Sequence, residues 1–279
     1  MASESGSTLS LHGALEPLAP GALIRLACGP LAVEIAPDAG GRLAQIVRDG
    51  VAWLVGHSEP NAAMIAWGCY PMLPWAGRVR HGRFEFEGRA YQLPLNFGEH
   101  AIHGVGFALP WRVEHVSPVH AELSLQLPDD ERWPFGGSAR QCIDVEDNAL
   151  RLQLSVTAGE RAMPAVIGWH PWFCKPDRIE FKPSRFYPRD AEGIAVRPVS
   201  ELPPGPWDDC FINDEPVLIE HAGQRLRLAS SCRHWVVYDE TAHATCIEPQ
   251  SGPPNAFSLE PTRLAPGSSI TASFALEWL

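Results

Sequence analysis

Apolar and polar residues alternate along most of the chain, which is the pattern of strands with one buried and one exposed face. Alternating runs, several of them paired around short turns, lie at 22–37, 42–55, 83–93, 140–156, 224–240 and 268–279. Two of the turns carry Asp49-Gly50 and Asp147-Asn148, dipeptides that favour tight hairpins. The pattern therefore predicts an all-β, mostly antiparallel protein.

Helices contribute little to the predicted architecture. No window of ten or more residues shows the 3.6-residue apolar repeat of an amphipathic helix, and 27 prolines and 24 glycines disfavour long helices. We expect a large antiparallel β-sandwich whose loops carry the chemistry. The Pro-rich stretch at 201–211 reads as a long loop. We predict a flexible N-terminus over 1–13 and a single domain over 14–279.

Composition and charge narrow the classes of partner. Hydrophobic residues make up 45% of the 279 positions, which is enough for a large core. Lys and Arg number 22 against 33 Asp and Glu, a net charge of −11. Nucleic acids and anionic membranes attract clustered positive charge, so neither is an expected partner. No apolar run approaches the length of a membrane span.

The cysteine pattern and the N-terminal sequence indicate the cellular compartment. The seven cysteines are odd in number, scattered, and never spaced as C-x-x-C. That pattern fits reduced thiols better than a disulfide framework. The N-terminal stretch lacks the basic segment and apolar run of a signal peptide. We expect a cytoplasmic protein, present as a monomer or homodimer.

Familiar cofactor motifs are missing from the chain. It has no Gly-rich phosphate loop, no strand-linked G-x-G-x-x-G and no H-E-x-x-H. His100 and His103 form an H-x-x-H after Glu99, a spacing that binds metal on a helix. Gly98 and Gly104 flank it, however, and indicate a loop. We therefore expect neither a metal nor an organic cofactor.

Several polar residues stand in aromatic or turn-rich surroundings. They are Arg78, His103, His170, Asp208, Asp209 and Glu248. Each alone has an ordinary structural explanation, such as a turn cap or a hydrogen-bonded core histidine. Together, on separate strand ends and loops, they suggest one convergent site. Aromatic faces with Arg, His, Asp and Gln side chains suit a neutral sugar. An acidic chain without a phosphate-binding loop also favours a neutral sugar over a phosphorylated one.

Five segments resemble the aldose 1-epimerase (galactose mutarotase) family and occur in that family's order. They are YPMLPWAGRVRHGRFEFEGRAYQLPLN (70–96), AIHGVGFALPW (101–111), GWHPWF (168–173), WDDCF (207–211) and CIEPQSGPPNAF (246–257). Gly77 and Val105 differ from the usual residues, so the chain resembles a divergent branch. The resemblance implies a β-sandwich with a sugar-binding cleft on one sheet.

The resemblance also implies residue roles. Glu248 corresponds to the family's catalytic base and His170 to its catalytic acid. Arg78, His103 and Asp208 correspond to sugar-binding residues, with Asp209 as the alternative to Asp208. Trp169 and Gln250 are added as expected sugar contacts, and Trp172 is the alternative aromatic wall.

Anomer interconversion needs a proton taken from the C1 hydroxyl and another given to the ring oxygen. We expect Glu248 to be ionised at rest and His170 to be protonated or to share a proton with a neighbour, with Asp208 helping to keep the histidine cationic.

Three other functions stay open on the sequence. A hexose 6-phosphate could be the substrate if Arg80 and Arg83 reach the cleft. The protein could bind sugars without catalysis. Glu248 and Asp208 could also form the carboxylate pair of a glycosidase.

Overall fold

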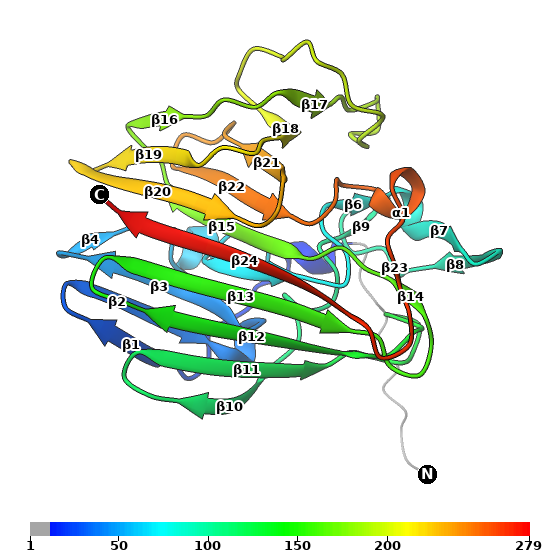
Figure 1. Cartoon of the computed structure of the whole chain (residues 1–279), viewed down its shortest axis with the longest axis horizontal. Coiled ribbons are helices and arrows are strands. Elements are labelled where there is room, and N and C mark those ends of the chain that lie inside the picture. The colour runs from blue at the N-terminus through cyan, green and yellow to red at the C-terminus, as the bar shows by residue number, and fades with distance from the viewer. Residues whose placement is uncertain (1–11) are drawn as a thin grey trace.

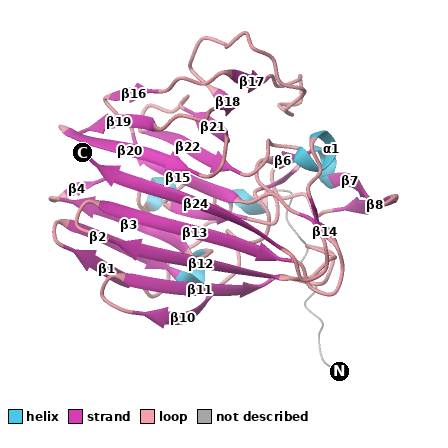
Figure 2. Cartoon of the chain, in the orientation of Figure 1, coloured by secondary structure: helices cyan, strands magenta, loops and turns pink. Residues whose placement is uncertain are grey.

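The computed structural model describes residues 12–279, and two large antiparallel sheets form its framework (Figures 1 and 2). The predicted flexible N-terminus falls mainly outside the described residues, although Gly13 already begins a 3-10 helix, η1 (Gly13–Leu15). The prediction of a mostly antiparallel β-sandwich is confirmed. Within residues 12–279, no helix is long and apolar enough to cross a lipid bilayer.

The larger sheet has ten strands. In spatial order they are β1 (Ile24–Cys28), β2 (Leu31–Ala36), β3 (Arg42–Arg48), β5 (Cys69–Met72), β15 (Gly168–Cys174), β22 (Ala244–Gln250), β21 (His234–Tyr238), β18 (Asp208–Ile212) and β17 (Arg185–Tyr187), with β4 (Val51–Ala52) paired to β3. Strands far apart in the sequence are thus neighbours at the centre of this sheet.

The smaller sheet has eight strands. In spatial order they are β10 (Arg112–Val116), β11 (His120–Gln126), β12 (Ser138–Val145), β13 (Ala149–Thr157), β24 (Ser269–Trp278), β20 (Gln224–Ser230), β19 (Val217–His221) and β16 (Arg178–Glu180). Buried and exposed residues alternate along β12, β13 and β24. One face of this sheet therefore meets solvent, as the period-two pattern predicts.

Short elements gather at one end of the sandwich, at the right of Figure 1. They are the pairs β6 (Arg78–Val79) with β9 (Ala101–Ile102), β7 (Arg83–Phe86) with β8 (Arg89–Gln92), and β14 (Met163–Pro164) with β23 (Arg263–Leu264), together with α1 (Ala256–Leu259). Three further 3-10 turns are η2 (Pro37–Ala39), η3 (Glu59–Asn61) and η4 (Arg80–Gly82). None of the described helices is long, in line with the sequence.

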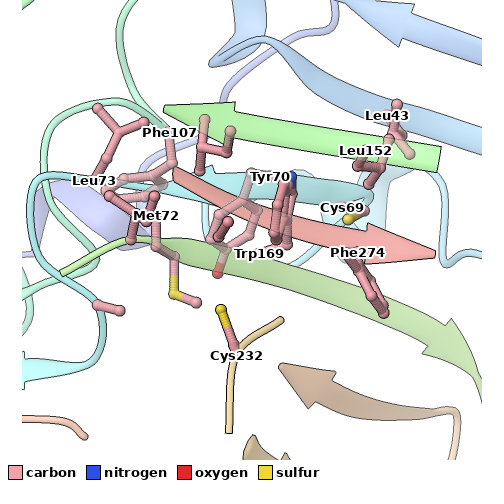
Figure 3. Packing of buried hydrophobic residues seen from close by; sticks show 14 of the residues in the cluster. Leu43, Cys69, Tyr70, Met72, Leu73, Phe107, Leu152, Trp169, Cys232 and Phe274 are labelled. Carbon is pink, nitrogen blue, oxygen red and sulfur yellow. The ribbon is translucent and has the colours of Figure 1, made fainter. Parts of the chain in front are cut away.

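The hydrophobic core lies between the two sheets. Trp169 of β15 packs against Phe274 of β24, with ring centroids 5.8 Å apart, and Figure 3 shows both within the packed cluster. The central strands β5 and β22 are buried at every position, and β15 at all but its last. One face of these strands meets the core and the other is covered by loops, so their sequences lose the alternation seen elsewhere.

Candidate active site

His170 and Glu248 meet because β15 and β22 are antiparallel neighbours in a fixed register. Gly168 lies opposite Gln250 and Trp172 lies opposite Cys246, which places His170 opposite Glu248. Gly168 permits this close pairing, since a Cβ there would lie 2.3 Å from the Pro249 carbonyl oxygen.

The His170 and Glu248 side chains form a buried pair in this register. His170 Nε2 lies 3.2 Å from Glu248 Oε1, and the two side chains are 6% and 3% exposed. The two residues are more than seventy positions apart in the sequence, and the pairing of their strands brings them into contact.

The pair lies on the floor of a cleft of about 450 Å³. Cross-strand neighbours continue the floor across the sheet in one row: His170, Glu248, Val236, Cys210 and Tyr187. Side chains in such a row share one face of a sheet. The floor is therefore built from five hydrogen-bonded strands, and the expectation that loops carry the chemistry is wrong for the central pair.

The two faces of β15 separate its tryptophans. Trp172 shares the face of His170 and lines the cleft. Trp169 points the other way: it is fully buried and its indole Nε1–H donates to Gln141 Oε1 at 3.0 Å. Because side chains alternate along a strand, Trp169 cannot share the face of His170. The structure thus corrects the expectation of a Trp169 sugar contact and places Trp172 there.

Aromatic rings hold the His170 imidazole. Tyr70 stacks on it with centroids 4.7 Å apart and planes at 27°, and Trp172 stacks at 5.5 Å and 16°. His103 meets the ring edge-on at 4.9 Å. A side chain enclosed in this way has few alternative rotamers, so the direction of its nitrogen atoms is set before any ligand binds.

Arg78 begins β6, His103 follows the neighbouring β9, and both line the same cleft. The Gly77 N–H donates to His103 Nδ1 at 3.3 Å, which leaves Nε2 to carry the proton of a neutral ring. Gly77 has φ +66°, and a Cβ there would lie 2.6 Å from Pro254. This crowding explains why glycine precedes the arginine in this chain.

Asp208 and Asp209 begin β18 at the mouth of the cleft, and both line it. Asp208 contacts Arg189 closely and lies 3.8 Å from Arg78. Asp209 Oδ1 lies 3.4 Å from Arg189 Nε. Of the two carboxylates, Asp208 joins Arg78, which agrees with the choice of Asp208. Sequence reasoning missed Arg189, because it stands in an irregular segment with no motif around it.

One wall of the cleft is the connection between β17 and β18, residues 188–207, which we call the strap. Gly193 and Ala195 of the strap line the cleft, and the Gly193 carbonyl accepts a bond of 3.5 Å from Arg78. Arg80 of the body contacts Asp190 closely and Glu192 at 3.0 Å. Half-exposed ion pairs of this kind are weak. The strap is therefore fastened by polar contacts, by backbone pairing of Val199 with β17, and by packing of Ala195 in a small hydrophobic cluster.

Burial sets the charge state of the central pair. It raises the pKa of Glu248 well above its ordinary value, and the nearby Asp208 charge raises it further. Burial also lowers the pKa of His170 to about 3. The favoured resting state is therefore a protonated carboxyl group beside a neutral imidazole, because desolvation penalises both charged forms. Burial thus disfavours the expected ionised Glu248 and cationic His170, and it outweighs the carboxylate that was expected to keep the histidine charged.

A sequence profile of aldose 1-epimerases matches residues 29–277. The chain belongs to the aldose 1-epimerase family. It is similar to the uncharacterized Escherichia coli K12 proteins YphB (30% identity over 184 residues) and YihR (27% over 158 residues). The matches cover 64% and 54% of this chain and 61% and 50% of those proteins. The chain thus spans less than two thirds of the curated relatives it matches.

Solved structures share the aldose 1-epimerase fold over nearly the whole chain. An Escherichia coli K12 structure superposes with a TM-score of 0.82 at 23% identity and covers 92% of this chain and 99% of its own. A galactose mutarotase-like protein from Clostridium acetobutylicum superposes with a TM-score of 0.80 at 17% identity. The match covers 92% of this chain and 95% of that protein. A GalM/aldose epimerase homologue from C. elegans has a TM-score of 0.80 at 17% identity. The match covers 92% of this chain and 98% of that protein. The low identities agree with a divergent branch of the family.

Two groups of possible metal-binding side chains lie in or beside the cleft. His103 reaches the cleft, while His100 turns away and bonds the strap at the Glu192 carbonyl, so the H-x-x-H pair does not converge. His170, Cys246 and Glu248 offer donor atoms within 4.8 Å of one another. Burial raises the pKa of the Cys246 thiol well above its usual range, so a metal bound there would have to displace the thiol proton.

Proposed function

We propose that this protein interconverts the α and β anomers of a neutral aldose by acid–base opening and closure of the sugar ring. The observation that carries the proposal is the buried contact of 3.2 Å between His170 Nε2 and Glu248 Oε1 on the cleft floor. A donor and an acceptor side by side in a site shielded from water can serve the two oxygens of one pyranose edge.

The proton count of the pair suits this reaction. The neutral pair and the ion pair contain the same number of protons, so a proton moving between His170 and Glu248 converts one into the other. Whichever partner holds that proton gives it to the ring oxygen, while the other accepts the proton of the C1 hydroxyl. Ring closure reverses the transfer and restores the pair. The family assignment of Glu248 as base corresponds to the ion-pair form.

Charge balance at the mouth supports a neutral substrate over a phosphorylated one. Arg78 and Arg189 both contact Asp208, so neither guanidinium is left without a carboxylate. Arg80 pairs with strap carboxylates and Arg83 bonds Gln92, away from the cleft lining. A phosphate would need positive charge that these residues already use.

The compartment is a further part of the proposal. All seven cysteines are free, four of them buried and three partly buried. Free thiols persist in reducing surroundings, which supports a cytoplasmic location.

Polarimetry tests the proposed reaction. Freshly dissolved α-glucose or α-galactose is followed to equilibrium with wild-type protein, Glu248→Gln and His170→Asn. Each variant should lose about 10²–10⁴-fold of the acceleration, because each removes one of the two proton-transfer groups. Glu146→Gln, at an exposed turn far from the cleft, is the matched control and should retain wild-type activity.

The outcomes separate the alternatives. Wild-type rates in Glu248→Gln would remove this residue from the mechanism. Sugar binding by the wild type without acceleration would favour a non-catalytic sugar-binding protein. A hexose 6-phosphate that is turned over faster than the free hexose would overturn the assignment of a neutral substrate.

A further inference from the structure

Arg42 is a buried cation that the proposed reaction leaves unexplained. Its side chain is 0% exposed in β3, and none of the ion pairs among residues 12–279 includes it. Its pKa falls to about 10, chiefly because of burial. A buried charge without a counter-ion is costly, so a protein keeps one where its contacts or its field are needed.

Four of the five N–H donors of the Arg42 guanidinium bond backbone carbonyl groups. It donates to the carbonyl oxygens of Ala39 (2.6 Å), Met64 (2.8 Å), Trp67 (3.0 Å) and Phe107 (2.9 Å). Lysine could not satisfy four acceptors arranged around a planar fork. The segment from Met64 to Trp67 includes the cleft-lining residues Ile65 and Ala66. Arg42 therefore fixes a wall of the cleft from behind.

Arg42 also lies over two aromatic rings, one of which belongs to the active site. Its guanidinium carbon is 4.2 Å from the centroid of the Trp67 ring and 5.0 Å from that of Tyr70. Tyr70 stacks on His170 at 4.7 Å, and its hydroxyl donates to the Ile65 carbonyl at 3.1 Å. A continuous stack thus runs from Arg42 through Tyr70 to His170.

We propose that Arg42 is a positioning residue for the His170–Glu248 pair, which it serves by holding Tyr70 flat against His170 and by placing a fixed positive charge behind that stack. A positive charge there opposes a cationic imidazole. It favours the proton on Glu248 until a sugar binds. The kinetic part of this role rests on the proposed function, but the effect on His170 does not.

Other groups also face His170 and must be included in the electrostatic argument. Glu248 and Cys246 face it from β22, Tyr70 from β5, and His103 from the turn after β9. Glu248 favours an imidazolium, whereas burial and Arg42 oppose one. Removing the Arg42 charge should therefore raise the pKa of His170 toward the ordinary histidine range.

Two substitutions separate the charge of Arg42 from its shape. Arg42→Gln removes the charge and keeps a donor for one carbonyl, while Arg42→Lys keeps the charge and loses the planar fork. Arg48→Gln is the matched control, because Arg48 stands at the other end of β3, where it lies over Trp278 at 6.0 Å. Histidine-labelled protein is titrated by NMR, with the His170 signal assigned through His170→Asn, and the pH profile of mutarotation is recorded.

The expected results differ for each variant. Arg42→Gln should move the His170 titration and the acid limb of activity to higher pH. Arg42→Lys should leave both near the wild-type position but lower kcat about tenfold or more with little change in KM, because Tyr70 and the cleft wall lose their fixed geometry. Arg48→Gln should change neither.

Three outcomes would overturn the proposal. One is a folded Arg42→Gln variant with an unmoved His170 titration. Another is a wild-type kcat in Arg42→Lys. If Arg42→Gln does not fold, this kcat alone tests the positioning role of Arg42. The third is an equal shift in Arg48→Gln. If the wild type shows no mutarotation, the proposed function fails, and the NMR titration still decides the role of Arg42.

Discussion

At the residue scale, the proposed anomer interconversion depends on one proton held between His170 and Glu248. The two groups are 3.2 Å apart and nearly fully buried, so they titrate as one unit rather than separately. The unit is competent with one proton. A second proton removes the acceptor, and loss of the proton removes the donor.

The pH dependence of activity follows from this count. Burial lowers the pKa of His170 to about 3, so gain of the second proton and loss of activity should occur well below the ordinary histidine range near 6.5. Burial raises the pKa of Glu248, so the alkaline loss should lie well above the ordinary glutamate range near 4.3. A kcat profile measured between pH 4 and 10 should show no loss of activity as the pH falls from 7 to 5. Activity that halves as the pH falls through 6.5 would contradict this assignment.

Sequence reasoning identified the two central residues through a family resemblance and failed where geometry decides. His170 and Glu248 stand in recognisable segments, but the register that joins them is a property of β15 and β22 together. Arg189 and Arg42 carried no motif. Their roles depend on what lies beside them in space, at Asp208 and at Tyr70.

At the scale of the element, β15 shows how one strand serves two environments. Its sequence GWHPWFC is apolar on both faces, so alternation of hydrophobicity could not tell the core face from the cleft face. Only the pairing with β5 and β22 shows that Trp172 faces the cleft and Trp169 the core. This is the physical reason why the wrong tryptophan was expected to contact sugar.

Substitution of the two tryptophans should separate stability from binding. Trp169→Phe removes the indole donor and leaves Gln141 Oε1 unpaired, which should lower the free energy of unfolding by about 1–3 kcal/mol with KM unchanged. Trp172→Leu should raise KM about tenfold, or about 1.4 kcal/mol of binding, with a smaller loss of stability. Urea unfolding and sugar-concentration series measure the two effects. The reverse pattern would return Trp169 to the binding site.

At the scale of the whole molecule, local alternation predicted the fold class but not the sheet assignment. The run 224–240 reads as one alternating pair, yet β20 joins the smaller sheet and β21 the larger one. Neighbouring strands in the sequence thus cross from one layer to the other. That choice depends on packing between layers, which a single sequence window does not contain.

The buried carboxyl group should also affect the stability of the whole fold. Because the pKa of Glu248 is higher in the folded than in the unfolded chain, the folded state binds more protons, and its stability falls as the pH rises above the unfolded pKa. Glu248→Gln removes this loss. Its melting temperature relative to wild type should rise as the pH is raised from 5 to 8, by about 2–4 °C for each kcal/mol gained. A constant difference across this range would show that Glu248 is not held protonated by burial.

The strap forms one wall of the cleft as an irregular segment that pairs with β17 at Val199. The proton-transferring groups are fixed by strand register, whereas residues 188–207 are fastened by Arg78, Arg80 and Arg189 at the rim. Grafting a longer or shorter connection between Tyr187 and Asp208 should therefore retune which sugars enter and leave the proton relay intact. On the proposed function, the strap selects the sugar and the paired strands transfer the proton. Exchange of the strap is therefore a route to altered sugar preference.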